Sequence, residues 1–139
     1  MAAYSRSRCR EWALQFLYQG EFSEQPEATA LEQFWSHFQD RGGPPAYLKA
    51  LVTGVGSNLE ELDALIVRYS EHWRLERMTV VDRNLLRLAI YELLYQPQIP
   101  PKVVINEAVE MAKRYGSEAS GAFVNGILDR VRISVGREV

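Results

Sequence analysis

The chain has 139 residues, of which 47% are hydrophobic and 24% charged, a composition that excludes intrinsic disorder and suits a single globular domain over residues 1–139. Its formal net charge of −2 argues against a protein that grips long duplex DNA, because such proteins are usually strongly basic. No stretch approaches the roughly 18 apolar residues of a membrane span. The chain has one cysteine, which cannot form an internal disulfide, and no apolar leader follows Met1, so we predict a cytoplasmic protein.

Helical periodicity runs through the first half of the chain. Apolar residues recur at spacings of three and four, and glycine or proline interrupts the pattern between segments. The four predicted helices contain residues 12–20, 30–38, 47–55 and 59–69. Pro26 stops the first helix, and the Gly-Gly-Pro-Pro run at 42–45 closes the second. Gly54 and Gly56 are expected to end or tighten the third, and Ser57 with Asn58 to cap the fourth.

The second half predicts further helices after a polar connector at residues 71–78. Thr79, with Asp82 three residues later, approximates a capping box that opens the fifth helix, which stops before Pro97. The sixth helix starts at Pro100-Pro101, with proline in its first turn, and ends at Gly116.

Ser117 is expected to cap a seventh helix that contains an Asn125-Gly126 dipeptide. That dipeptide favours a hairpin only between alternating strands, and its flanks here repeat with helical spacing. We therefore predict a glycine inside a helix, tolerated because another backbone approaches it closely. The whole pattern predicts an all-α fold of about seven helices.

Residues able to carry catalysis do not form a recognisable set. His37 and His72 are far apart and lack the spacing of a metal motif, so no metal is expected. Cys9 has no base nominated beside it, and a structural thiol explains it better than a nucleophile. The Thr-Gly-Val-Gly-Ser run at 53–57 lacks the remaining residues of a phosphate-binding loop. We predict no catalytic residue, no cofactor and no enzymatic activity.

Arg6, Arg8 and Arg10 are the only charged side chains among the first ten residues. Removing their +3 from the net charge of −2 leaves −5 on the rest, so a basic tip sits on an acidic body. Cations there oppose the dipole of the helix they open, so helix stability does not account for them. On a helix Arg6 and Arg10 would point the same way, as a clamp for the phosphates of a short single-stranded nucleic acid. A solvated basic terminus is the alternative.

A second basic and aromatic group lies at the end of the sixth helix. Lys113, Arg114 and Tyr115 precede a turn of small residues at 116–121, and Phe123 follows it. Small residues let a ligand approach the backbone, and an aromatic ring offers a stacking face for an unpaired base. On spacing alone, Phe123 is better explained as a core residue and the turn as a plain connection.

Two blocks of the sequence contain specific motifs in a fixed order. The first, residues 8–18, reads RCREWALQFLY, an arginine-rich start followed by Ala-x-Gln-x-Leu-Tyr. The second, from residue 82 to residue 129, contains LRLAIYEL, INEAVEMAK and FVNGILD in that order. Together the two blocks resemble the NusB family of transcription antitermination factors, and the similarity extends in register across nearly the whole chain.

The resemblance implies a fold of two small packed bundles. It also implies binding to the boxA RNA element of ribosomal operon transcripts, together with NusE, a small-subunit ribosomal protein. With other Nus factors in the RNA polymerase elongation complex, this assembly would help the polymerase resist premature termination. Carried over by position, the residues in contact with RNA or beside it are Arg6, Arg8, Arg10, Lys113, Arg114, Glu118 and Phe123. Asp82 matches an acidic position in the family's surface for NusE, although an acid in a first helical turn also has a purely structural explanation.

Two positions depart from the family pattern. Relatives often have an acid where this chain has Ala119, and a basic residue where it has Ala122. Losing the cation should weaken phosphate attraction and losing the acid should remove repulsion, so RNA affinity and base preference stay open.

Other roles for the same domain are also open. NusB-like domains form the front part of certain RNA cytosine methyltransferases, but those enzymes continue into a cofactor-binding domain, and the length of this chain favours the separate factor. A helical adaptor without RNA function is a further alternative. The sequence leaves open both a monomer and a homodimer formed through the first helix.

Overall fold

Seven helices account for most of the computed structural model, which describes residues 4–21, 27–38, 42–71 and 73–137. They are α1 Arg6–Gly20, α2 Glu27–Ser36, α3 Ala46–Ser57, α4 Leu59–Tyr69, α5 Val80–Tyr95, α6 Pro101–Tyr115 and α7 Ser120–Ser134, with a short 3₁₀ turn η1 at Leu75–Arg77. The predicted all-α class is confirmed. None of the helices that the structure describes is long and apolar enough to cross a membrane.

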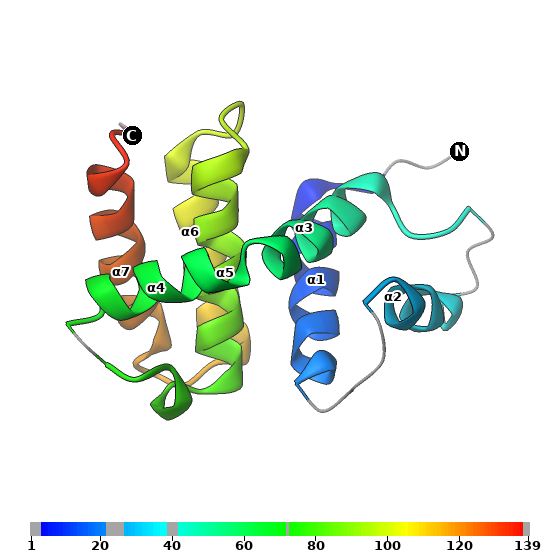
Figure 1. Cartoon of the computed structure of the whole chain (residues 1–139), viewed down its shortest axis with the longest axis horizontal. Helices are drawn as coiled ribbons and strands as arrows, with labels where there is room; N and C mark the ends of the chain where they lie inside the picture. The colour runs from blue at the N-terminus through cyan, green and yellow to red at the C-terminus, as the bar shows by residue number, and fades with distance from the viewer. Residues whose placement is uncertain (1–3, 22–26, 39–41, 72, 138–139) are drawn as a thin grey trace.

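The helices form two groups that share α5. Figure 1 shows α1, α2 and α3 on one side and α4, α6 and α7 on the other, with the α1 and α6 axes running in the same general direction as α5. Helix α5 contacts five of the others, α1, α3, α4, α6 and α7. The fold of two small bundles is therefore confirmed, and α5 is the element that joins them.

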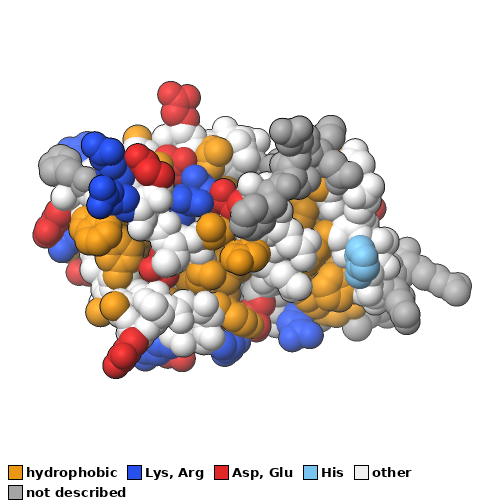
Figure 2. Space-filling view, turned by 90° about the horizontal axis from the view of Figure 1, so that it is seen from below, with side chains coloured by type: hydrophobic (Ala, Val, Ile, Leu, Met, Phe, Trp, Pro, Cys, Tyr) orange, Lys and Arg blue, Asp and Glu red, His pale blue; other side chains and the backbone are white. Residues whose placement is uncertain are grey.

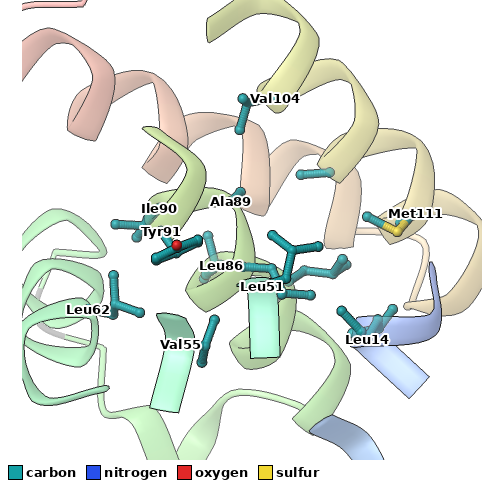
Figure 3. Packing of buried hydrophobic residues seen from close by; sticks show 14 of the residues in the cluster. Leu14, Leu51, Val55, Leu62, Leu86, Ala89, Ile90, Tyr91, Val104 and Met111 are labelled. Carbon is teal, nitrogen blue, oxygen red and sulfur yellow. The ribbon is translucent and has the colours of Figure 1, made fainter. Parts of the chain in front are cut away.

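One hydrophobic cluster extends through both groups. Leu86 and Ile90 of α5 are fully buried, and Figure 3 shows Leu14 of α1 and Leu62 of α4 on different sides of them. Burying a leucine side chain contributes roughly 1.5–3 kcal/mol relative to leaving it in water. The apolar stripes that predicted the helices from sequence are the surfaces that meet here.

Aromatic rings attach α2 to α1. The rings of Trp12 and Trp35 meet edge to face at 4.9 Å between centroids, and those of Phe16 and Phe34 at 5.6 Å. Such pairs stabilise by about 0.5–1.5 kcal/mol beyond the area they bury. This packing fixes the short helix α2 against α1.

Side-chain caps fix the starts of the two helices that matter most for the site. Ser5 Oγ accepts a hydrogen bond from the Arg8 amide at 3.1 Å, which starts α1 with its arginines in the first two turns. Thr79 Oγ1 accepts one from the Asp82 amide at 3.1 Å, so the predicted cap of α5 is confirmed. Each cap stabilises its helix by about 1 kcal/mol.

Two other predicted caps are wrong. The Asn58 side chain does not cap α4. Its Nδ2 instead donates to the Gly54 carbonyl at 2.8 Å, at the end of α3. Ser117 does not cap α7, which begins at Ser120 after one further turn, and the Ser117 amide donates to Ser120 Oγ at 2.9 Å. In both places the predicted capping residue forms a hydrogen bond with a residue three or four positions away and does not cap the helix that follows.

Two glycines have roles other than those predicted. Gly54 does not end α3, which continues to Ser57; a Cβ at this position would lie 2.2 Å from ring carbons of Tyr91. Gly126 lies inside α7 as predicted, but nothing among the described residues comes within 4 Å of a Cβ built there. The expected close backbone approach at Gly126 is therefore wrong, and the close approach is at Gly54.

We expect Gly54→Ala to lower the free energy of unfolding by about 1–3 kcal/mol, because the buried ring of Tyr91 must move to make room. The matched control is Gly126→Ala, which adds the same methyl group in open space and should raise stability by up to about 1 kcal/mol. Urea denaturation of the three proteins measures both values. Equal effects of the two substitutions would contradict the packing of Tyr91 on Gly54.

Candidate nucleic-acid interface

Arg6 and Arg8 lie exposed on the first turn of α1. The guanidinium carbon of Arg6 lies 5.5 Å from the centroid of the Tyr47 ring, and that of Arg8 lies 5.1 Å from the Trp12 ring. Cation–π contacts of this kind contribute about 0.5–1 kcal/mol at exposed sites. Each arginine therefore has an aromatic support beneath it and remains accessible to an anion in solution.

Arg10 is buried, and the predicted pairing of Arg6 with Arg10 in one exposed clamp is wrong. Only 3% of Arg10 is exposed; its Nε lies 2.8 Å from Glu92 Oε1 and its Nη1 lies 3.0 Å from Glu107 Oε1. The two arginines do share one side of α1. One turn further along, however, that side already faces α5 and α6, so the charge of Arg10 is neutralised inside the protein.

The groups around Arg10 form a polar cluster from four helices, which extends from the buried Arg10 and Glu92 to the surface at Ser7. Tyr47 of α3 donates to Glu92 Oε2 at 2.5 Å, and Ser7 of α1 donates to Glu107 of α6. Burial alone would lower the pKa of Arg10, but the hydrogen bonds and charge of Glu92 outweigh it and raise that pKa. Burial, followed by Glu92, raises the pKa of the Tyr47 hydroxyl, which stays a neutral donor. The cluster fixes the first turns of α1 against α3, α5 and α6.

The second predicted basic group lies beside α1. Arg114 is 55% exposed and its Nη1 lies 3.2 Å from Glu11 Oε2, while the Tyr115 hydroxyl donates to the same oxygen at 2.7 Å. Lys113, next to them, is 63% exposed. Glu11 thus places the end of α6 beside the start of α1, and we call the exposed cations of these two segments, Arg6, Arg8, Lys113 and Arg114, the α1–α6 edge.

The turn before α7 continues from the end of this edge. Gly121 lies against the Lys113 side chain, with 3.3 Å from a built Cβ to Lys113 Cγ, and Glu118 is exposed nearby in sequence. Phe123 is half-buried: it packs on the core, as spacing favoured, and keeps part of its ring exposed. Ala119 and Ala122 are both exposed, so neither departure from the family pattern affects the core.

Trp73 is a further aromatic side chain on this part of the surface, and it was not predicted as a site residue. It is 53% exposed, and its ring meets that of Phe123 at 6.0 Å between centroids and 63° between planes. One feature of the sequence could have identified it: a tryptophan lies within a polar connector, where no helical periodicity accounts for an apolar side chain.

Asp82 lies in the first turn of α5 and is 7% exposed. Its Oδ1 is buried without a hydrogen-bond partner among the described residues, which is costly for a carboxylate. The preceding residue, Val81, lines a groove of about 740 Å³ together with Tyr18 and Tyr115. Figure 2, which views the protein from below, shows hydrophobic side chains across this face with charged side chains of both signs around them.

Residues considered for catalysis lie apart from this surface or from one another. Cys9 is fully buried; burial raises the pKa of its thiol, outweighing the backbone bond from Leu48 and the charge of Arg10. His37 is exposed and its Nδ1 lies 3.0 Å from the Gln33 carbonyl, while His72 lies outside the described residues. Within the described segments no three His, Cys, Asp or Glu side chains are grouped as a metal ion would require.

Comparison with known proteins gives one consistent result. The sequence model of the NusB family matches residues 7–132. The transcription antitermination protein NusB of Myxococcus xanthus (strain DK1622) is 50% identical over 137 residues, covering 96% of this chain and 98% of that protein. The protein of the same name from Sorangium cellulosum (strain So ce56) is 46% identical over 133 residues, covering 96% and 95%.

Solved structures agree with the sequence comparison. NusB of T. maritima has 44% sequence identity and a TM-score of 0.80, covering 94% of this chain and 92% of that one. A chain in the crystal structure of antitermination factors NusB and NusE in complex with double-stranded RNA has 27% identity and a TM-score of 0.79, covering 93% and 96%.

The buried cluster predicts an unequal response to charge removal. We expect Arg10→Met to lower the free energy of unfolding by about 3–5 kcal/mol, because Glu92 is left buried without its cation. The double variant Arg10→Met/Glu92→Leu removes both charges and should recover most of that loss.

Urea denaturation at neutral pH measures these changes. Arg130→Met is the matched control: Arg130 is 48% exposed and 3.5 Å from Glu71, so the loss should stay below about 1 kcal/mol. A loss at Arg10 no larger than the loss at Arg130 would contradict the buried ion pair.

Proposed function

The chain belongs to the NusB family, and we propose that it is a cytoplasmic, RNA-binding transcription antitermination factor. In this proposal it binds boxA RNA of ribosomal operon transcripts together with NusE. With other Nus factors the complex then helps RNA polymerase resist premature termination. The observation that carries the proposal is the likeness, over nearly the whole chain, to NusB solved with NusE and RNA.

The α1–α6 edge supports the RNA-binding part of the proposal. Arg6 and Arg8 present guanidinium groups, which bind phosphate through two hydrogen bonds, and Lys113 and Arg114 extend the positive charge along α6. A short row of cations suits a single-stranded segment, whose unpaired bases are free to stack on aromatic rings. In this proposal Phe123, beside the exposed ring of Trp73, supplies such a face.

Arg10 has an indirect part in the proposed function. Its guanidinium is buried and donates to Glu92 and Glu107, so a phosphate would have to displace these carboxylates to reach it. We assign Arg10 to holding α1 in place and the direct phosphate contacts to Arg6 and Arg8.

Asp82 supports the NusE part of the proposal. A buried carboxylate oxygen without a partner is an unfavourable arrangement that a lysine or arginine from another protein would relieve. The groove that begins at Val81 offers apolar surface next to it. We propose that a basic side chain of NusE binds Asp82 while apolar residues of NusE cover the groove.

The RNA contacts are tested by fluorescence anisotropy with boxA RNA and a scrambled RNA, each with and without NusE. We expect preference for boxA RNA that increases with NusE. The double variant Arg6→Ala/Arg8→Ala should lower the affinity and reduce the slope of log K against log salt by roughly 1 to 1.5, because two phosphate contacts are lost.

Arg68→Ala is the matched control for this experiment. Arg68 also lies over a tyrosine ring, at 5.4 Å from Tyr69, but on α4 and away from the α1–α6 edge. Its loss should leave RNA binding unchanged. Equal binding of both RNAs, or binding of neither, with NusE present would make a helical adaptor without RNA function the better explanation.

The NusE contact is tested by titration calorimetry of NusE into Asp82→Asn. We expect affinity for NusE to fall about tenfold or more, as when one partner of a desolvated charge pair is removed. Glu60→Gln is the control, since Glu60 lies in the first turn of α4 and has the same favourable interaction with a helix dipole. Equal affinities of the two variants for NusE would exclude Asp82 as the anchor.

A further inference from the structure

Tyr47 lies between the exposed Arg6 and the buried Arg10 cluster. It is half-buried near the start of α3, and its two ends have different partners. The hydroxyl donates to Glu92 Oε2 at 2.5 Å, and the ring face lies 5.5 Å from the guanidinium carbon of Arg6. One side chain thus connects a fixed internal ion pair to a cation on the surface.

We propose that Tyr47 is a positioning residue for RNA recognition, whose ring holds the guanidinium of Arg6 ready for a phosphate. The inference rests on the proposed function, because it concerns how the α1–α6 edge binds RNA. From the sequence alone, Tyr47 is only the first residue given for the predicted helix at 47–55.

The ring can orient the guanidinium without using up its hydrogen bonds. A cation is attracted to the negative face of an aromatic ring, whereas the N–H donors of arginine lie in the guanidinium plane and point outward. A free arginine side chain loses rotamer entropy when it binds a phosphate. An arginine already placed over a ring loses less, so its binding to phosphate is stronger.

The ring can perform this task because it is itself fixed. Its hydroxyl is bound to a carboxylate that Arg10 holds through Nε and Nη2, each 2.8 Å from a Glu92 oxygen. The pKa of Tyr47 is raised by burial and by Glu92, so the hydroxyl keeps the proton that makes this bond. Trp12, which lies beneath Arg8, is a less suitable position for a test. It is 7% exposed and belongs to the core, so any substitution there disturbs packing.

The test is a double-mutant cycle of Tyr47→Leu and Arg6→Ala, with affinity for boxA RNA measured by anisotropy in the presence of NusE. We expect Tyr47→Leu to weaken binding roughly 3- to 10-fold when Arg6 is present, the size of a coupling between contacting residues. In the Arg6→Ala background the same substitution should have less than about a twofold effect. A residue important only for the fold would weaken both backgrounds equally.

Tyr47→Phe is measured in the same cycle: it keeps the ring and removes only the bond to Glu92 that fixes it, so a smaller loss of affinity is expected, again only when Arg6 is present. Circular dichroism at the assay temperature shows whether each variant is folded, and if Tyr47→Leu is not, Tyr47→Phe replaces it. A loss of affinity that occurs when Arg6 is present and not in the Arg6→Ala variant supports the positioning role.

Equal losses in both backgrounds, or no loss with either substitution, overturn it. If the unsubstituted chain shows no preference for boxA RNA, the proposed function fails first and this inference fails with it. Normal binding of RNA without coupling between Tyr47 and Arg6 overturns this inference alone.

Discussion

The buried ion pair between Arg10 and Glu92 is the constraint on which the arrangement of the other helices depends. A charge with 3% exposure needs a partner, so α1 must lie where Glu92 of α5 and Glu107 of α6 can reach it. Desolvation offsets much of the attraction in such a pair, and its main effect is to make alternative positions of α1 unfavourable. Tyr47 adds α3 to the same cluster, so a few polar contacts orient four helices whose remaining contacts are mostly apolar.

Fixing α1 in this way gives the three neighbouring arginines different roles. Arg10 faces α5 and is neutralised, whereas Arg6 and Arg8 lie at the rim and remain exposed over aromatic rings. The end of α6, which packs on α5 and α7, lies alongside, and Glu11 binds both Arg114 and Tyr115 there. The resulting α1–α6 edge has few cations, and two of them are already paired with acids, Arg114 with Glu11 and Lys113 with Glu110. Electrostatic attraction for RNA is therefore limited, in keeping with the proposal that the chain binds RNA together with NusE.

Much of the fold was predictable because its causes are local in sequence. Apolar spacing located seven helices, and Thr79 with Pro101 marked two of their starts. The wrong caps at Asn58 and Ser117 reflect local hydrogen bonds, whereas two other errors depend on contacts between distant residues. Arg10 was assigned to the surface because its partner is 82 positions away. Gly54 was expected to end or tighten α3, and its actual role, making room for the Tyr91 ring, depends on a residue of another helix. For the candidate site, the basic groups were found from composition and family resemblance. Trp73 and the support of Arg6 by Tyr47 required the packed structure, since neither belongs to a local pattern.

The sequence distance across the Arg10 cluster also determines when the protein can finish folding during synthesis. Arg10 is 82 residues from Glu92 and 97 from Glu107, so about three quarters of the chain must leave the ribosome before the cluster can close. Until then the first helix is a basic, amphipathic segment without the acidic partners that neutralise it. Closing such long loops costs entropy before any contact repays it, so the docking of α1 belongs to the late part of folding. A nascent chain of this protein therefore exposes its most basic segment for most of its translation.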